Sequence, residues 1–403
     1  MRNIPIIETG PIANPPSNHY ERGKWYKRRG YLEQALESFK AAAHTTSTDI
    51  ESREWKEVDP SWLEYGLLSM RMRLFAKSEE AFRIVVQHSG TYAQEALNQW
   101  AALLLMKGMP DQLICERLLD ETRNYNTAPS MVGKSMFYIG AYRYASLCFA
   151  KQKRIYSDSC IQNAASMVMT GQIAEALQFI DHYLHEHHGD PIKRPNARTS
   201  EAIQLSRIGK LCKWSLADSI PDRFIFKSEA LELARMAVSL NMVPIAEALL
   251  PEQDTSAYYA LICFLYYEGY RDLAISKMGQ LEALPLDGRD TFSKKLCFIA
   301  AENLYIHRKY HEAASLFEQL RLADPLHEET RFGEAACYLQ TTLISLSSRL
   351  EAQYTSASAS QEIKSHMNNV NTALHIVEST NWRTIWSPAQ DRIENSKPKS
   401  ILN

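Results

Sequence analysis

The chain has 403 residues, of which 45% are hydrophobic and 23% are charged, and its formal net charge is −2 at pH 7. This composition excludes an intrinsically disordered chain, because it supplies enough apolar material for a large core, and it excludes a strongly basic or acidic protein. The most apolar run, Tyr258 to Tyr267, is about half as long as the roughly 20 residues that a membrane-spanning helix needs. We therefore expect a soluble protein without membrane insertion.

The seven cysteines are scattered along the chain, and no two of them form a Cys-x-x-Cys pair. Neither a disulfide framework nor a zinc knuckle is expected from this spacing. The segment from Met1 to Gly10 also lacks the long apolar core of a secretory signal. These features indicate a cytoplasmic protein with reduced, mostly buried thiols and no cofactor.

The first patterned element in chain order begins near Pro16. Small and aromatic residues follow at regular spacing, namely Gly23, Tyr26, Gly30, Ala35, Phe39 and Ala42. This pattern resembles the 34-residue tetratricopeptide repeat (TPR), a hairpin of two helices. The resemblance implies that small residues let the two helices approach, and that an aromatic residue of the second helix fills the remaining space.

Further segments follow the same pattern, beginning near residues 59, 93, 126, 157, 227, 255 and 294. One hairpin cannot bury its apolar face alone, whereas stacked hairpins bury it continuously. The resemblance therefore implies an all-α protein, an α-α superhelix (solenoid) of tetratricopeptide-like hairpins with C-terminal capping helices.

Polar and proline-bearing segments divide the expected repeats into two blocks. Between the blocks, Glu201 to Leu216 has apolar residues at helical spacing, which predicts a bridging helix and a hinge there. After the last repeat, 327–352 and 361–379 read as two helices that cap the stack. The expected parts are an N-terminal extension (1–15), repeats (16–185), a linker with the bridging helix (186–226), repeats (227–326), capping helices (327–380) and a tail (381–403).

In tetratricopeptide proteins the first helix of each hairpin lines an inner groove. Carried over to this chain, the resemblance implies a groove that is basic near the N-terminus and aromatic or apolar further along; Glu302 also falls at a groove position. The groove residues are Lys24, Arg28, Leu67, Arg71, Leu97, Lys134, Phe137, Tyr138, Tyr259, Tyr266, Tyr267, Phe298 and Tyr305.

Two interpretations of this lining are open. An exposed aromatic groove could anchor an extended peptide or an amphipathic helix, with a basic residue meeting an acidic group on it. Alternatively, a tightly wound superhelix or the chain's own tail buries the same residues.

A histidine cluster offers a possible zinc or nickel site through His182, His185, His187 and His188. However, the cluster falls at the end of an expected helix, where histidine is favourable because of the helix dipole. It also departs from the His-Glu-x-x-His spacing, since Gly189 stands in the second histidine's place. We favour the structural interpretation and expect no metal.

The basic run from Arg22 to Arg29 could contact nucleic acid, but the near-neutral chain favours a solvated face or one that meets an acidic peptide. No phosphate-cradling glycine loop, nucleophile elbow or dinucleotide fingerprint is present. We therefore expect neither enzymatic activity nor a nucleic-acid partner.

The leading hypothesis is an interaction scaffold or adaptor whose groove binds a peptide or protein segment. One alternative is a bacterial-style regulator that closes around a signalling peptide, although repeats that begin near residue 16 leave no room for a DNA-binding domain before them. Another is a metal-binding protein that uses the cluster from His182 to Asp190.

Overall fold

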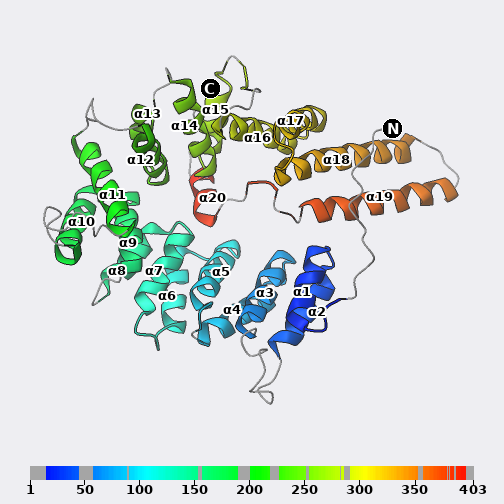
Figure 1. The fold of residues 1–403 in the computed structure, drawn as a ribbon. Helices are drawn as coiled ribbons and strands as arrows, with labels where there is room; N and C mark the ends of the chain where they lie inside the picture. Colours follow the sequence, from blue (N-terminus) through cyan, green and yellow to red (C-terminus); the bar gives the residue numbers. More distant parts are fainter. Residues whose placement is uncertain are drawn as a thin grey trace. The chain divides into compact units, whose positions relative to one another are not determined.

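The computed structural model describes residues 15–44, 58–88, 90–152, 157–188, 200–217, 227–250, 254–281, 283–285, 291–352, 357–378, 380, 382–384 and 387–395. Within these ranges the chain forms helices and connecting turns, with no β-strand (Figure 1). The all-α class predicted from the sequence is therefore confirmed.

The chain divides into two compact units, Met1–Leu103 and Leu104–Asn403. The first contains α1 (His19–Arg28), α2 (Leu32–Ala43), α3 (Val58–Arg71), α4 (Phe75–Gln87) and most of α5 (Ala93–Met106), which runs across the boundary. The second contains α6 (Asp111–Glu121), α7 (Ala128–Tyr138), α8 (Tyr142–Ala150), α9 (Ser157–Met169), α10 (Ile173–His188), α11 (Ser200–Ala217), α12 (Lys227–Ser239), α13 (Val243–Leu249), α14 (Thr255–Tyr267), α15 (Arg271–Met278), α16 (Thr291–Ile306), α17 (Tyr310–Ala323), α18 (Glu328–Ala352), α19 (Ala357–Glu378) and α20 (Pro388–Asn395).

One kind of turn recurs between paired helices. In the turn after α7, the N–H of Gly140 donates to the carbonyl of Phe137 (2.9 Å), and the N–H of Ala141 donates to that of Met136 (2.8 Å). This is the Schellman arrangement, which satisfies the last carbonyls of a helix through one residue with positive φ. The residues that hold this position are Gly30, Arg73, Gly108, Gly140, Gly171, Asn241, Gly269 and Arg308.

In three hairpins a glycine of the first helix faces a buried phenylalanine of the second. A Cβ atom on any of these glycines would lie 2.6–2.7 Å from the ring, so no larger residue fits unless the ring or the helices shift. The small and aromatic positions of the sequence pattern thus pack on each other. The pairs are Gly23 with Phe39, Gly66 with Phe82, and Gly133 with Phe149.

The two hairpins of the first unit also pack on each other through α2 and α3. The ring of His44 stacks edge-on against Trp62, with the ring centroids 4.9 Å apart. Nζ of Lys27 lies 2.6 Å from a carboxylate oxygen of Glu64. A partly basic surface of α1 is therefore engaged within this unit.

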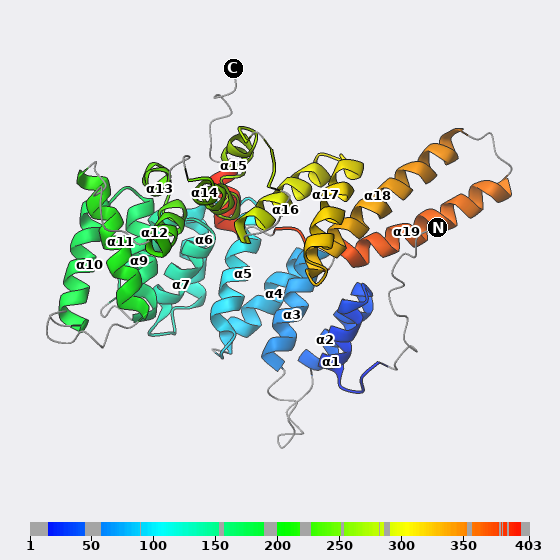
Figure 2. The same cartoon turned by 45° about the horizontal axis from the view of Figure 1, so that its top comes forward.

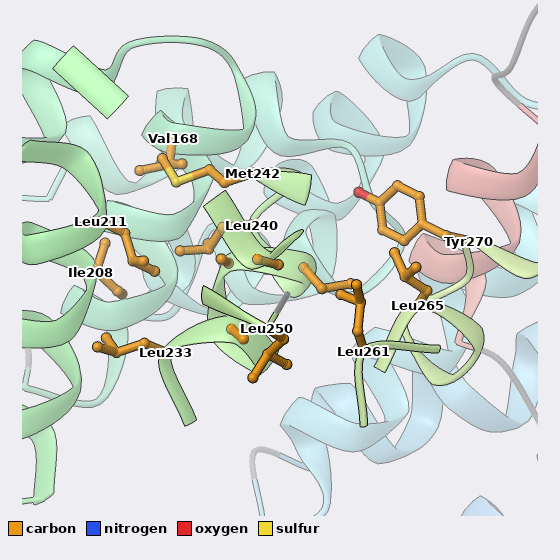
Figure 3. Close-up of a cluster of buried hydrophobic side chains, with 14 of the residues drawn as sticks. Val168, Ile208, Leu211, Leu233, Leu240, Met242, Leu250, Leu261, Leu265 and Tyr270 are labelled. Atoms are coloured by element: carbon orange, nitrogen blue, oxygen red, sulfur yellow. The ribbon is translucent and has the colours of Figure 1, made fainter. Parts of the chain in front are cut away.

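In the second unit, one cluster of buried apolar side chains extends from α9 to α16. Figure 3 shows part of this cluster, from Val168 to Tyr270. The bridging helix predicted at Glu201–Leu216 is present as α11, and its residues Leu205, Ile208 and Leu211 belong to this cluster. The described part of the predicted linker thus lies within a continuous core. The remaining linker residues 189–199 and 218–226 lie outside the described residues.

The two long helices α18 and α19 follow the last hairpin, close to the ranges predicted for the capping helices. Helix α17 packs on α18, and α18 on α19. A second apolar cluster joins them to α16 and includes Trp382, which comes from the segment assigned to the tail. Residues 388–395 of that segment form α20, whereas 1–14 and 396–403 lie outside the described residues.

Candidate functional site

The C-terminal segment, defined here as residues 382–384 and 387–395, lies against the first helices of hairpins in the second unit. Figures 1 and 2 both show α20 beside α14, where the backbone of Gln390 approaches Gly269. Helix α20 also packs on α7. The segment therefore covers part of the surface that the sequence predicted as a groove.

Trp382 is the apolar anchor of the segment and is 2% exposed. Its ring meets Tyr305 and Phe317 edge-on, at centroid distances of 5.1 and 5.6 Å. Such contacts add to the free energy of burying a large aromatic surface. The indole Nε1 is buried without an acceptor in the described chain. Among the described residues, the contacts to Trp382 are therefore made by its ring and not by its N–H.

Thr384, two residues after Trp382, binds the buried carboxylate of Glu302. Its backbone N–H donates to Oε1 of Glu302 (2.7 Å), and its hydroxyl donates to Oε2 (2.8 Å). The hydroxyl of Tyr266 also donates to Oε2 (3.1 Å). Burial raises the pKa of Glu302, although these hydrogen bonds act in the opposite direction. Burial also raises the pKa of Tyr266, which keeps its hydroxyl protonated as a donor.

Helix α20 begins with a reciprocal cap. The N–H of Ser387 donates to Oε1 of Gln390 (2.8 Å), and the N–H of Gln390 donates to the hydroxyl of Ser387 (3.3 Å), with Pro388 as the first helical residue. Nε2 of Gln390 donates in turn to the carbonyl of Tyr267 (2.9 Å). The side chain that caps α20 therefore also ties it to α14.

Two turn glycines let α20 approach closely. A Cβ atom on Gly269 would lie 2.6 Å from the carbonyl oxygen of Gln390, and one on Gly140 would lie 3.0 Å from Cα of Ala389. Further along, the guanidinium of Arg392 donates to both carboxylate oxygens of Asp111, at 2.6 and 2.9 Å. Such bidentate pairing fixes orientation as well as position.

A pocket of about 510 Å³ lies beside Trp382 and Thr384. Lys295 is exposed at this pocket, and its ammonium lies 6.0 Å from the ring centroid of Tyr267. Lys294 lies 3.4 Å from Asp324. The lining residues are Tyr267, Thr291, Lys294, Lys295, Phe298, Leu320, Asp324, His327, Glu329, Thr330, Trp382, Arg383 and Thr384. The lining thus combines aromatic rings with amine, hydroxyl and carboxylate groups.

Of the predicted groove residues, Tyr267, Phe298 and Tyr305 contact the C-terminal segment or line the pocket. Tyr266 is linked to the segment through Glu302, which accepts from both Tyr266 and Thr384. Tyr266, Phe298 and Tyr305 are buried rather than exposed. Trp382 of the C-terminal segment contacts Tyr305 directly, so this segment contributes to the burial of Tyr305. The other two side chains contact neighbouring helices: Tyr266 donates to Glu302 of α16, and Phe298 meets Phe317 of α17 edge-on.

The other predicted groove residues of the second unit are half-buried, namely Lys134, Phe137, Tyr138 and Tyr259. Phe137 stacks edge-on against Tyr142 at a centroid distance of 5.3 Å. These side chains are partly used in packing between helices.

The remaining five predicted groove residues belong to the first unit. Lys24 pairs with Glu21 (2.9 Å), and Arg28 and Arg71 are exposed. Leu67 is half-buried, whereas Leu97 is fully buried. Leu97 is therefore a core residue, because its helix position faces neighbouring helices rather than solvent.

The histidine cluster provides no metal site within the described residues, where no group of three histidine, cysteine or acidic side chains is positioned to hold an ion. His182 lies 3.4 Å from Glu186 on the exposed surface of α10. The side chains of His187 and His188 lie outside the described residues.

The sequence analysis missed Trp382, Thr384 and Gln390 as site residues. One signal was available, because Ser387-Pro-Ala-Gln390 has the serine and glutamine spacing of a capping box with proline at the first helical position. Nothing local marks Trp382 or Thr384, whose partners are 65 or more positions away in the chain.

The comparisons with family models and with curated proteins identified no relative. No family model matches the chain, and no curated protein matches it significantly.

Proposed function

We propose that the protein is a tetratricopeptide-like superhelical scaffold that binds a peptide or protein segment along the first helices of its hairpins. One observation carries the proposal: the chain's own C-terminal segment lies on α14 and α16 through contacts of the kind that hold peptide ligands. The recurring turns and the glycine–phenylalanine pairs support the resemblance to tetratricopeptide hairpins.

The groups that hold the segment are those of a polypeptide receptor. Tyr305 and Phe317 receive an aromatic side chain, Glu302 receives a backbone N–H and a hydroxyl, and the carbonyl of Tyr267 receives an amide. None of these contacts requires that ligand and receptor share one chain. A few anchors of this kind carry most of the binding free energy in peptide recognition.

Site-specific crosslinking tests the proposal. We expect a photo-reactive amino acid in place of Lys295, which lines the pocket and is exposed, to capture a partner segment in cells. The matched control places it at Lys309, an exposed lysine before α17 that does not line the pocket. Peptide mass spectrometry should assign the crosslink to one partner sequence at Lys295 only.

Charge reversal at the same position provides a second test of the proposed function. Lys295→Glu should lower affinity for the captured partner by about tenfold or more, because a local cation is replaced by an anion, whereas Lys309→Glu should leave it unchanged. A partner that binds both variants and the wild type equally would show that the pocket surface is not the binding site.

A further inference from the structure

We propose that the surface holding residues 382–384 recognises, on a partner protein, a segment with an aromatic residue followed two positions later by threonine or serine. The chain's own Trp382 and Thr384 then compete with that partner segment for the same surface. This inference rests on the proposed function and specifies its ligand.

The aromatic requirement follows from the environment of Trp382. Its ring is enclosed and meets two aromatic edges, from Tyr305 and Phe317. An alanine would leave this space empty, with the loss of contacts that a cavity brings. Since Nε1 has no acceptor in the described chain, the site selects an aromatic ring and does not require an indole. Phenylalanine should serve nearly as well as tryptophan.

The hydroxyl requirement follows from Glu302, which is 1% exposed. Both of its oxygens receive donors from Thr384, one from the backbone and one from the hydroxyl. A ligand with valine at this position would leave one carboxylate oxygen with only the donor from Tyr266. Loss of a hydrogen bond to a buried charged group is costly. Serine supplies the same hydroxyl and should be accepted.

The C-terminal segment leaves part of the site unfilled. The pocket of about 510 Å³ continues from Trp382 and Thr384 toward Lys295, Thr291 and Thr330. A partner segment could use this space with its flanking residues, in addition to the two anchor positions. Such extra contacts would offset the advantage of the internal segment, which is present at the high effective concentration that covalent linkage gives.

The test uses the full-length chain and a fluorescent synthetic peptide of residues 380–395. Binding is measured by fluorescence polarisation to the wild type and to the Trp382→Ala/Thr384→Val double variant, whose internal segment lacks both anchors. We expect the double variant to bind the peptide at least about tenfold more tightly than the wild type, because its own C-terminal segment no longer occupies the site. Circular dichroism verifies that helical content is retained.

Peptide variants then test the two positions without changing the protein. Trp382→Phe and Thr384→Ser peptides should bind within about threefold of the parent, whereas Trp382→Ala and Thr384→Val peptides should lose about tenfold or more. If the double variant loses helical content, the same peptides are measured against the full-length Thr384→Val variant, which retains the tryptophan.

The inference is overturned if the Trp382→Ala/Thr384→Val double variant is folded and does not bind the parent peptide. It is also overturned if all four peptide variants bind alike. Either result would make the C-terminal segment a permanent part of the fold. The proposed function would be unaffected, because crosslinking at Lys295 does not depend on this peptide sequence.

Discussion

A single backbone conformation recurs in the hairpin turns, and different residue types occupy it at different conformational cost. Gly171 has φ of +80°, and a Cβ atom there would meet nothing within 4 Å. Arg308 adopts φ of +62° despite its side chain. Left-handed backbone costs a residue with a Cβ atom about 1 kcal/mol or more, whereas glycine adopts it freely.

We therefore predict that Gly171→Ala lowers the free energy of unfolding by about 1 kcal/mol through the backbone alone. Arg308→Gly should raise the free energy of unfolding by about 0.5 kcal/mol. Glycine removes the backbone strain of positive φ in the native state, and this gain outweighs the conformational entropy that glycine adds to the unfolded chain. Gly279→Ala is the control, because Gly279 has an ordinary helical φ of −66°. Denaturant unfolding followed by circular dichroism measures all three. Equal effects of the two alanine substitutions would contradict the explanation.

The cysteines show how burial changes the pKa of a single side chain. All seven are buried thiols. Burial raises the pKa of Cys160 to about 12 and that of Cys212 to about 11, and the thiolate is the reactive form. By contrast, the neighbouring Sγ of Cys148, 3.4 Å away, lowers the pKa of Cys115 through a hydrogen bond.

We predict that a thiol reagent such as dithionitrobenzoate at pH 8 reacts only slowly with the native protein and rapidly with all seven thiols after denaturation. Raising the pH should make the hydrogen-bonded pair of Cys115 and Cys148 react before the other thiols, and Cys115→Ala should remove that first phase. Rapid native labelling of Cys160 or Cys212 would contradict the burial that the structure gives them.

At the scale of an element, the docking of α20 depends on the turn glycine Gly269. Its substitution combines positive φ with contact to the backbone of Gln390, so the two effects need separation. Asparagine tolerates the left-handed conformation, as Asn241 does in the equivalent turn with φ of +60°. Gly269→Asn thus tests mainly the steric contact.

We predict that Gly269→Asn increases hydrogen exchange at residues 388–395 by about tenfold or more, because α20 can no longer lie against the turn. Gly171→Asn, in a turn with open space around it, should leave exchange at α20 unchanged. If both variants behaved alike, close approach at Gly269 would not be what holds α20.

The connection between the C-terminal segment and α16 depends on pH through Glu302. Because burial raises its pKa in the folded protein, the native carboxyl keeps its proton to a higher pH than the unfolded carboxyl does. The folded state therefore binds more protons in this window, and stability falls as the pH rises from about 4.5 through the native pKa.

We predict that Glu302→Gln weakens this dependence. The free energy of unfolding of the wild type minus that of the variant should decline as the pH rises from about 4.5 through the raised native pKa. Taking the difference cancels the contribution of Glu268, whose pKa burial also raises. A difference that stays flat or rises with pH would show that Glu302 keeps an ordinary or lowered pKa.

Local patterns predicted the elements well, because each hairpin is specified by nearby residues. Gly23 and Phe39, or Gly133 and Phe149, lie 16 positions apart and pack on each other, so one sequence window contains both partners. Pro244 occupies the first turn of α13, where proline is tolerated. The site was harder to predict. Glu302 and Thr384 meet across 82 positions, and no local pattern records that pairing.

At the scale of the second compact unit, the central question is whether α11 separates two blocks or joins them. A hinge was predicted around it, because the repeat pattern is interrupted on both sides. In the structure, Leu211 is fully buried in a cluster that also contains Val168 of α9 and Leu233 of α12 (Figure 3). Apolar contacts of this kind make neighbouring hairpins unfold together.

We predict that Leu211→Ala lowers the free energy of unfolding by about 2–5 kcal/mol and raises hydrogen exchange in both α9–α10 and α12–α13. Leu216→Ala on the same helix is the matched control, since Leu216 is 53% exposed and its truncation should cost at most about 0.5 kcal/mol. A hinge would confine the effect of Leu211→Ala to one side of α11. Increased exchange on both sides would show that α11 joins the hairpins before and after it into one cooperative unit.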